Sequence, residues 1–316
     1  MIGKDIGKAA EWLRKGQLVA IPTETVYGLG ANALDSEAVL SIFETKNRPT
    51  FDPLIVHADS LDSLGKYVLD LPWQARKLAE AFWPGPLTLV VPKGPQIPDL
   101  VTAGLPTVAV RVPNHPLTLA LLSSLDFPIA APSANPFGYI SPTTANHVAA
   151  QLGDAIPYIL DGGDCQVGIE STIVSFEGSI PTVLRLGGLS LESIEAVIGK
   201  VATTLHSSSN PQAPGMLKSH YAPRKPLYLA SREEVLEQAA LPGRGGLFFT
   251  DSPEVHDLSH SLVLSPGGDL REAAQHLFGY LRQLDTLPIE TIWAEKLPDQ
   301  DLGRAINDRL LRASVR

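Results

Sequence analysis

The sequence has very little cysteine and no long apolar run. Cys165 is its single cysteine, which excludes an internal disulfide and a cysteine-rich zinc site and suits a reducing compartment. The longest apolar runs, such as residues 87–91, are far shorter than the roughly 18 residues that a membrane span needs. The first residues also lack the unbroken apolar stretch of a signal peptide. We therefore expect a soluble, cytoplasmic protein that does not contact a membrane.

Positive charge is also scarce. The formal net charge is −9, whereas sequence-independent binding of nucleic acid depends on clustered lysine and arginine. We therefore expect direct binding of nucleic acid to be weak or absent. A few cations in one cleft can still hold a small polyanion such as a nucleotide, and the overall charge does not forbid that.

The familiar nucleotide and metal signatures are missing as well. The sequence has no G-x-x-x-x-G-K-[ST] loop, no G-x-G-x-x-G after a strand, no zinc-site spacing and no calcium loop. Any nucleotide site must be unconventional, and magnesium would enter with the nucleotide, held largely by its phosphates. The YGLG segment, residues 27–30, is expected to form a glycine-bearing turn after a strand.

What is present predicts two domains. The chain has 316 residues, a length beyond which a single hydrophobic core usually stops growing. Apolar residues make up 44%, an ordinary fraction for a globular protein. Composition changes at residues 206–215, where Ser, Asn, Pro and Gly crowd together as in exposed linkers. We predict a catalytic domain over residues 1–205, a linker over 206–226 and a second domain over 227–316.

Helical and strand-like segments alternate along the chain. Apolar strands are covered by helices, and the hairpin-like neighbours at 87–93 and 107–113 indicate mixed strand directions, so the pattern predicts an α/β fold with a small Rossmann-like second domain. Helices are expected near 6–16, 35–46, 60–68, 72–83, 115–125, 143–152, 231–240, 269–284 and 301–312. Strands are expected at 17–23, 53–58, 87–93, 107–113, 128–134, 158–160, 171–176, 226–230, 246–250, 260–265 and 291–296.

Two polar segments follow predicted elements closely. Lys46 and Arg48 lie where a helix ends before Pro49, and both can reach a cleft, although on this segment alone they are better explained as cations that complement a helix end. Ser133, Asn135 and Ser141 lie in a loop after an apolar strand. Such loops bind ligands in α/β folds, but turn formation and helix capping explain them equally well.

Other polar residues lie within or beside strands. Arg111 and Arg185 each demand an anionic partner, which is either a ligand or a structural acid such as Glu170. His57 closes one strand, and His220 precedes Tyr221 in the linker. Sequence alone does not choose between a structural histidine and one that binds a ligand. Cys165 has no histidine near it in sequence and is interpreted as a small structural side chain.

Taken in order, PTETVYGLG, KNRP, PLIVH, PSAN, GIEST, LRLGG and HYAP resemble the YrdC/Sua5 family of threonylcarbamoyl-AMP synthases. The match spans most of residues 10–223, and the second domain resembles the C-terminal extension of the longer, Sua5-type members. The resemblance implies a YrdC-like twisted mixed sheet around a deep, positively charged cavity. There L-threonine, bicarbonate and ATP with Mg²⁺ would give threonylcarbamoyl-AMP and pyrophosphate, the first step of N6-threonylcarbamoyladenosine formation in tRNA.

The same resemblance assigns roles by position. The catalytic set would be Lys46, Arg48, Ser133 and Asn135. ATP would contact Arg48, Asp52, Thr107, Ser133, Ser141, Arg185, His220 and Tyr221, the last two on a lid that excludes water. Threonine would contact Thr25, His57, Arg111, Ala131 through its backbone, and Ser171.

One position departs from the family pattern. Relatives usually carry Asn or His just before PLIVH, whereas this chain has Asp52, whose charge would repel polyphosphate unless Mg²⁺ or Lys46 lies between. The resemblance also implies a downstream transferase as a partner. The alternatives are a double-stranded RNA-binding module and an enzyme of the O-carbamoyltransferase or hydrogenase-maturation type.

Overall fold

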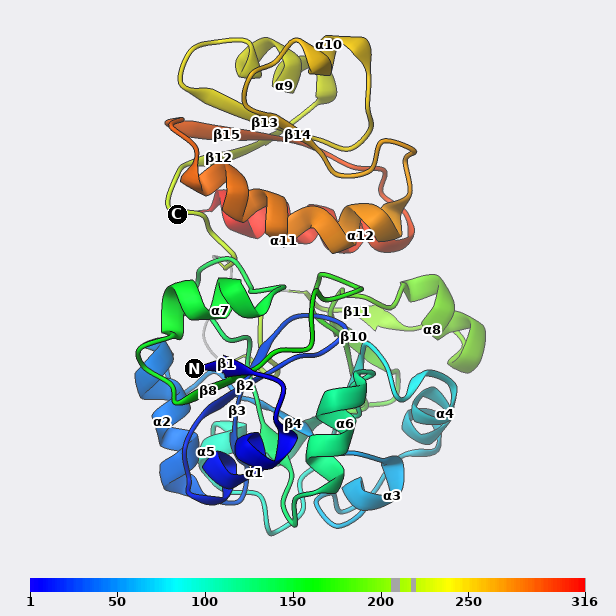
Figure 1. Ribbon diagram of the computed structural model, residues 1–316. Coiled ribbons are helices and arrows are strands. Elements are labelled where there is room, and N and C mark those ends of the chain that lie inside the picture. Colours follow the sequence, from blue (N-terminus) through cyan, green and yellow to red (C-terminus); the bar gives the residue numbers. More distant parts are fainter. Residues whose placement is uncertain (206–210, 217–219, 316) are drawn as a thin grey trace.

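The computed structural model describes residues 1–205, 211–216 and 220–315. Within them, the strands form an 11-stranded mixed sheet and a 4-stranded parallel sheet. Figure 1 shows the smaller sheet and its helices stacked above the larger one. The α/β prediction with a second, Rossmann-like sheet is therefore confirmed.

The larger sheet runs in the order β1-β8-β2-β3-β7-β4-β6-β5-β9-β10-β11. Strands β5 and β6 pair antiparallel whereas β4 and β6 pair parallel, so the predicted mixture of directions is confirmed. The strands are β1 (Ile2–Gly3), β2 (Val19–Ile21), β3 (Gly28–Asn32), β4 (Ile55–His57), β5 (Leu87–Pro92), β6 (Thr107–Arg111), β7 (Ile129–Ala130), β8 (Tyr158–Leu160), β9 (Thr172–Ser175), β10 (Thr182–Arg185) and β11 (Ala202–Thr203).

Helices surround this sheet, and several begin at side-chain caps. Asp5, Asp35, Thr144 and Ser190 each accept a hydrogen bond from a backbone N–H in the first turn of the helix that follows. The helices are α1 (Ile6–Arg14), α2 (Ser36–Lys46), α3 (Leu61–Leu64), α4 (Trp73–Phe82), α5 (Asp99–Thr102), α6 (Pro116–Ser123), α7 (Ala145–Leu152) and α8 (Leu191–Ile198).

The predicted turn at YGLG is wrong, because Gly28 and Gly30 lie inside strand β3. A Cβ atom on Gly30 would lie 2.9 Å from Ile129 Cγ2, and one on Gly28 would lie 3.2 Å from Ala131 Cβ. These glycines therefore let neighbouring strands and the loop after β7 pack closely. The two glycines therefore indicate close packing of the strand backbone and not a turn.

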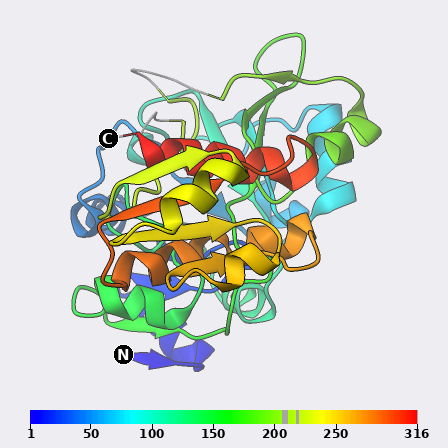
Figure 2. The same ribbon diagram turned by 90° about the horizontal axis from the view of Figure 1, so that it is seen from above.

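The smaller sheet has the order β12-β15-β13-β14, with all strands parallel. Helices α9 and α10 cover its outer face, and α11 and α12 lie between it and the larger sheet (Figure 1); Figure 2 looks down through these layers. The strands are β12 (Leu227–Ala230), β13 (Arg244–Phe248), β14 (Ser261–Val263) and β15 (Thr291–Glu295), and the helices are α9 (Arg232–Ala239), α10 (Pro253–His256), α11 (Leu270–Thr286) and α12 (Asp301–Ser314).

The two sheets share buried apolar contacts. One cluster runs from Leu29 of β3 through Tyr221 to Leu277 of α11. Polar contacts add to it, since Arg282 donates to Ser141 O and Gln151 Oε1, and Tyr139 Oη donates to Asp285 Oδ2 at 2.7 Å. The second domain is therefore held against the first by both apolar and polar contacts. The exact domain limits stay a prediction.

The predicted exposed linker is partly wrong. Its residues 206–210 lie outside the described residues, but most of 211–216 is buried. Pro214 O accepts a hydrogen bond from Arg185 and Gly215 O accepts one from Arg312. The Pro- and Gly-rich composition therefore lets the backbone at Pro214 and Gly215 approach buried arginines, and it does not mark a solvent-exposed segment. Within the described residues, no helix is long and apolar enough to cross a membrane.

Candidate active site

A small, partly open cavity lies where loops at the ends of β4, β6, β7, β9 and β10 meet. Its volume is about 50 Å³, whereas pockets that hold whole ligands commonly have about 300–1,000 Å³. Its charged lining consists of Arg48, Arg111, Arg185 and Glu170, an excess of cations. The residues that line it are Thr23, Thr25, Val26, Gly28, Arg48, Ile55, His57, Arg111, Ala131, Pro132, Ser133, Glu170, Ser171, Arg185, Pro214, Gly215, His220 and Tyr221.

Most of the residues predicted from sequence meet here. Those that line the cavity are Thr25, Arg48, His57, Arg111, Ala131, Ser133, Ser171, Arg185, His220 and Tyr221. Lys46, Asp52, Asn135 and Ser141 are buried directly behind this lining and contact it. Thr107 lies apart, at the start of β6 opposite Pro92.

Lys46 ties the two predicted pairs together. It ends α2, where Asn47 adopts a left-handed conformation with φ of 51° that turns the chain toward Arg48. The Lys46 ammonium, 1% exposed, donates to the backbone oxygens of Ser133 and Asn135. Burial, together with the neighbouring charge of Arg48, holds the pKa of Lys46 well below its usual value. The pairs therefore form one unit, held by a cation that has no carboxylate directly on it among the described residues.

Asp52 is the partner of Arg48. The two side chains form an ion pair, with 2.9 Å between Arg48 Nη2 and Asp52 Oδ2, and Asp52 is fully buried. Arg48 also donates to the backbone oxygens of Asp52 and Pro53. Burial raises the pKa of Asp52, and Arg48 opposes that rise. The repulsion expected from an acid at this position is thus offset by a cation four residues earlier.

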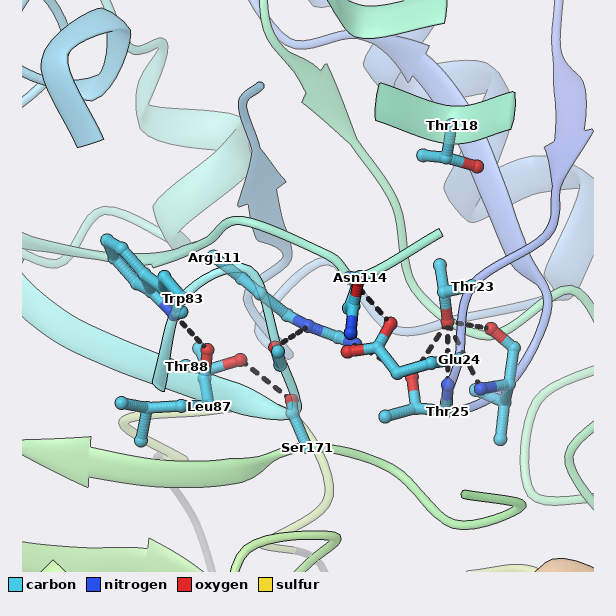
Figure 3. Close-up of polar contacts among 12 residues, drawn as sticks. Thr23, Glu24, Thr25, Trp83, Leu87, Thr88, Arg111, Asn114, Thr118 and Ser171 are labelled. Atoms are coloured by element: carbon cyan, nitrogen blue, oxygen red, sulfur yellow. Dashed lines mark hydrogen bonds and ion pairs between the residues drawn. The ribbon is translucent and has the colours of Figure 1, made fainter. Parts of the chain in front are cut away.

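Arg111 is held by Glu24, which sequence reasoning missed (Figure 3). Arg111 Nη2 lies 2.7 Å from Glu24 Oε1, its Nη1 donates to Thr25 Oγ1 at 2.9 Å, and its Nε donates to Gly85 O. Glu24 Oε2 also accepts from the Asn114 backbone. The structural partner expected for a strand-borne arginine is therefore present, but it comes from the TET segment and not from Glu170.

Arg185 has no carboxylate in ion-pair contact among the described residues. Its donors reach Ser171 O at 3.0 Å, Ser171 Oγ at 3.1 Å and Pro214 O at 3.2 Å. The Ser171 hydroxyl in turn bonds Thr88 Oγ1 at 2.7 Å, a contact visible in Figure 3. Burial lowers the pKa of Arg185 to about 10. An arginine whose charge is only partly compensated favours an anion in the cavity.

Glu170 is held from both domains. Ser141 Oγ donates to its Oε1 at 2.5 Å, and Arg309 Nε of α12 donates to its Oε2 at 3.1 Å. Ser141 lies behind this carboxylate and not on the cavity surface. Arg309, which lies 139 residues further along the chain, was not predicted.

The remaining predicted residues are neutral. His57 is 3% exposed, and burial, assisted by Arg111, lowers its pKa to about 3. The Ala131 backbone N–H donates to Ile55 O. The His220 ring packs against Phe137 and Tyr221, with centroids 5.7 and 4.2 Å apart. Burial also lowers the pKa of His220 and raises that of the Cys165 thiol, which keeps Cys165 unreactive.

A buried, cation-lined cavity between loops of a mixed sheet defines an enzyme site for small anionic substrates. Residues 11–187 match the Sua5/YciO/YrdC family, described as "Telomere recombination", and residues 189–315 match the family described as "Threonylcarbamoyl-AMP synthase, C-terminal domain". The chain belongs to the Sua5-type threonylcarbamoyl-AMP synthases, so the predicted family is confirmed.

Similar proteins cover nearly the whole chain. The threonylcarbamoyl-AMP synthase of Pyrococcus abyssi is 43% identical over 323 residues, which cover 97% of this chain and 93% of the relative. That of Bacillus subtilis is 42% identical, covering 98% and 92%. The crystal structure of P. abyssi Sua5 complexed with L-threonine superposes with a TM-score of 0.92 at 40% identity, covering 99% of this chain and 97% of that one.

Proposed function

We propose that this chain joins L-threonine, bicarbonate and ATP into threonylcarbamoyl-AMP and pyrophosphate. The observation that carries the proposal is the cavity itself, where Arg48, Arg111 and Arg185 converge from three segments far apart in the sequence. Full-length similarity to threonylcarbamoyl-AMP synthases supports the same assignment. The product belongs to the formation of N6-threonylcarbamoyladenosine in tRNA.

The reaction needs fixed positive charge more than a nucleophile. The threonine amine attacks bicarbonate, water leaves and a carbamate forms, whose oxygen then attacks the α-phosphorus of ATP and expels pyrophosphate. Negative charge grows on the phosphate oxygens and on the leaving group, where preorganised cations and donors act best. Arg48 and Arg185 supply that charge at the lining, Ser133 supplies a neutral donor, and Lys46 acts from directly behind the lining by holding Ser133. Asn135, whose amide N–H groups bond Pro136 O and Tyr139 O, shapes the same loop.

The threonine subsite lies toward Arg111. Thr25 accepts a hydrogen bond from Arg111, and His57 lies opposite Arg111 in the pairing of β4 with β6. Ser171, which bonds Arg185, also lines the cavity, and the three residues offer hydroxyl and imidazole groups to the amino acid. His57 is neutral because of its low pKa, so it can bond the substrate without adding charge. The backbone at Ala131 forms part of the same wall.

Magnesium enters as the complex with ATP. Within the described residues, no group of three or more His, Cys, Asp or Glu side chains is arranged to hold a metal. Mg²⁺ commonly keeps several waters and binds mainly to phosphates, so the substrate itself carries it. The cation excess of the cavity fits the remaining phosphate charge.

Substrate entry requires one wall of the cavity to move. At about 50 Å³ the cavity is too small for ATP. Pro214, Gly215, His220 and Tyr221 form the wall contributed by the predicted linker. This segment acts as the lid, and closing it shields the carbamate and the mixed anhydride from water.

One assay tests the proposal. Pyrophosphate release is measured with all substrates and with threonine, bicarbonate or ATP omitted in turn. The proposal requires release that depends on all three, and serine in place of threonine measures selectivity. Release that persists without bicarbonate, or transfer from carbamoyl phosphate, would favour the carbamoyltransferase alternative. RNA binding that weakens steeply with salt, without ATP turnover, would favour the RNA-binding module. Passage of the product to a tRNA threonylcarbamoyl transferase is part of the same proposal.

A further inference from the structure

Two buried arginines of the second domain reach the wall of the cavity. Arg309 and Arg312 lie on α12 and are 0% and 1% exposed. Arg309 Nε donates to Glu170 Oε2 at 3.1 Å, and Glu170 lines the cavity. Arg312 Nη1 donates to Gly215 O at 2.6 Å, and Gly215 lines it too. Neither arginine is itself part of the lining, so both act on the cavity through other residues.

Glu170 needs a counter-charge if the cavity is to accept anions. It is the one carboxylate in the lining among the described residues. Ser141 supplies a hydroxyl donor, but the charge is balanced by Arg309. Without Arg309, an unpaired carboxylate would face the polyphosphate of ATP and the bicarbonate ion. A buried charge that loses its partner is strongly unfavourable for binding.

Arg309 also fixes Tyr221. Its guanidinium lies over the Tyr221 ring at 5.3 Å from the centroid, and Phe278 of α11 stacks on that ring at 5.5 Å. Tyr221 has a φ of 65°, in the left-handed region that a tyrosine rarely adopts. Such a conformation persists only where its surroundings impose it, and here the second domain does so.

Arg312 fastens two points that lie on either side of residues 206–210. Its Nη2 donates to Leu205 O and its Nη1 to Gly215 O, each at 2.6 Å. Asp308 accepts from the Nε of Arg312 at 2.9 Å and from the Nη1 of Arg309 at 3.2 Å, which orients both guanidinium groups. The lid wall is therefore tied to α12 by backbone contacts that do not depend on the lid's own side chains.

We propose that Arg309 and Arg312 are positioning residues for the reaction. Arg309 neutralises Glu170 and holds Tyr221, and Arg312 holds Gly215, so the second domain completes the substrate site of the first. The inference rests on the proposed function, because it assigns these contacts to the binding of ATP.

The test compares arginines of one helix in the full chain. Arg309→Met is expected to raise the KM for ATP at least about tenfold with a smaller change in kcat, because the unpaired Glu170 opposes the phosphates. Arg304→Met is the matched control: Arg304 also lies on α12 and bridges the domains to Glu192 at 2.6 Å, but the two side chains are 30% and 53% exposed. Its KM is expected to stay within about twofold of wild type.

Two further variants separate charge from folding. The double variant Glu170→Gln with Arg309→Met removes both charges and is expected to recover most of the lost ATP affinity. Arg309→Lys keeps the charge, and its KM for ATP is expected to lie between those of wild type and Arg309→Met. It replaces Arg309→Met in the comparison if that variant does not fold. A double variant as impaired as Arg309→Met would overturn the neutralising role of Arg309.

Hydrogen exchange supplies a readout that does not need turnover. Exchange at residues 211–216 and 220–222 is expected to quicken in Arg309→Lys and Arg312→Lys but not in Arg304→Met. Wild-type exchange in both variants, or an unchanged KM for ATP in an active Arg309→Met enzyme, would overturn the inference. The proposed function, and not this inference, would be refuted if the wild type released no pyrophosphate while exchange still quickened in Arg309→Lys and Arg312→Lys.

Discussion

Arg185 in the cavity of the first domain and Arg309 on the α12 face of the second are buried in opposite electrostatic settings. In the cavity, Arg185 contacts only carbonyl and hydroxyl oxygens among the described residues, and burial lowers its pKa to about 10. On α12, burial also acts to lower the pKa of Arg309, but Tyr221, Glu170 and Asp308 outweigh it and the pKa is raised. Arg185 therefore keeps an unmet demand for an anion, whereas Arg309 is matched by Asp308 of its own helix and by Glu170 of the first domain.

The same contrast separates two lysines that both bind backbone oxygens. Lys46 spans Ser133 and Asn135 beside the cavity, and Lys225 binds Leu284, Asp285 and Leu287 at the C-terminal end of α11. A lysine at a helix end is an ordinary stabilising feature. We infer that the same hydrogen bonding has a catalytic consequence for Lys46 beside the cavity and a structural one for Lys225, which fastens the linker to α11 of the second domain.

The largest expected effect follows from removing the cavity lysine. Lys46→Ala deletes the buried amine that holds the loop carrying Ser133 and Asn135. Pyrophosphate release is therefore expected to fall by about 10³-fold or more, as when a preorganised donor is lost. Steady-state kinetics measures the loss, and circular dichroism should show an intact fold. Full activity in this variant would end the catalytic assignment of Lys46.

Lys225→Ala should give the complementary result. Hydrogen bonds from a charged group to the end of α11 are lost, which is expected to lower the free energy of unfolding by about 2–3 kcal/mol. Turnover per folded molecule should stay within about twofold of wild type, because the backbone oxygens that Lys225 binds, unlike that of Ser133 bound by Lys46, do not belong to residues of the cavity lining. Urea unfolding and kinetics on the same samples test this. A large fall in turnover without a loss of stability would erase the distinction between the two lysines.

The sequence predicted the elements better than the partners of charged residues. Helix α2 was predictable because Asp35 caps it and Pro49 follows its end, which are local signals. Arg111 pairs with Glu24, which lies 87 positions earlier in the sequence. Glu170 pairs with Arg309, which lies 139 positions later. No local pattern records such pairs. Gly28 and Gly30 misled for the same reason, since the neighbours that require them come from β2, β7 and the loop after β7.

Acid should weaken the first domain through His57. Its pKa is about 3 in the folded chain, against an ordinary value of 6.5. The unfolded chain therefore binds a proton first, so stability is complete above pH 6.5 and is lost as the pH falls toward the folded value. From neutral pH to pH 5, this histidine alone is expected to cost about 2 kcal/mol.

His57→Gln removes this titration while keeping a polar side chain. Between neutral pH and pH 5, the wild type should lose about 2 kcal/mol more unfolding free energy than the variant. Urea unfolding followed by tryptophan fluorescence measures the difference. Equal losses in the two proteins would mean that the burial of His57 is relieved on acidification, and the contrast between the regions would then rest on the arginines alone.

The smallest expected effect probes where the regions meet. Gly215 has a φ of 78°, and a Cβ there would lie 3.0 Å from Tyr221 Oη and 3.1 Å from Arg185 Cδ. Gly215→Ala is expected to raise the KM for ATP by about tenfold, equivalent to about 1.4 kcal/mol, because it displaces Arg185.

Gly199 provides the matched control for Gly215, because its φ is 80° and nothing lies within 4 Å of an added Cβ. Gly199→Ala also places a side chain on backbone with a positive φ, at a cost of about 1–3 kcal/mol, but without a steric contact. It should lower stability slightly and leave the KM unchanged. If both variants raise the KM equally, strain transmitted through the backbone is the cause. If only Gly215→Ala does so, ATP binding depends on the position of Arg185, which is set by the Gly215 wall that Arg312 of α12 holds in place.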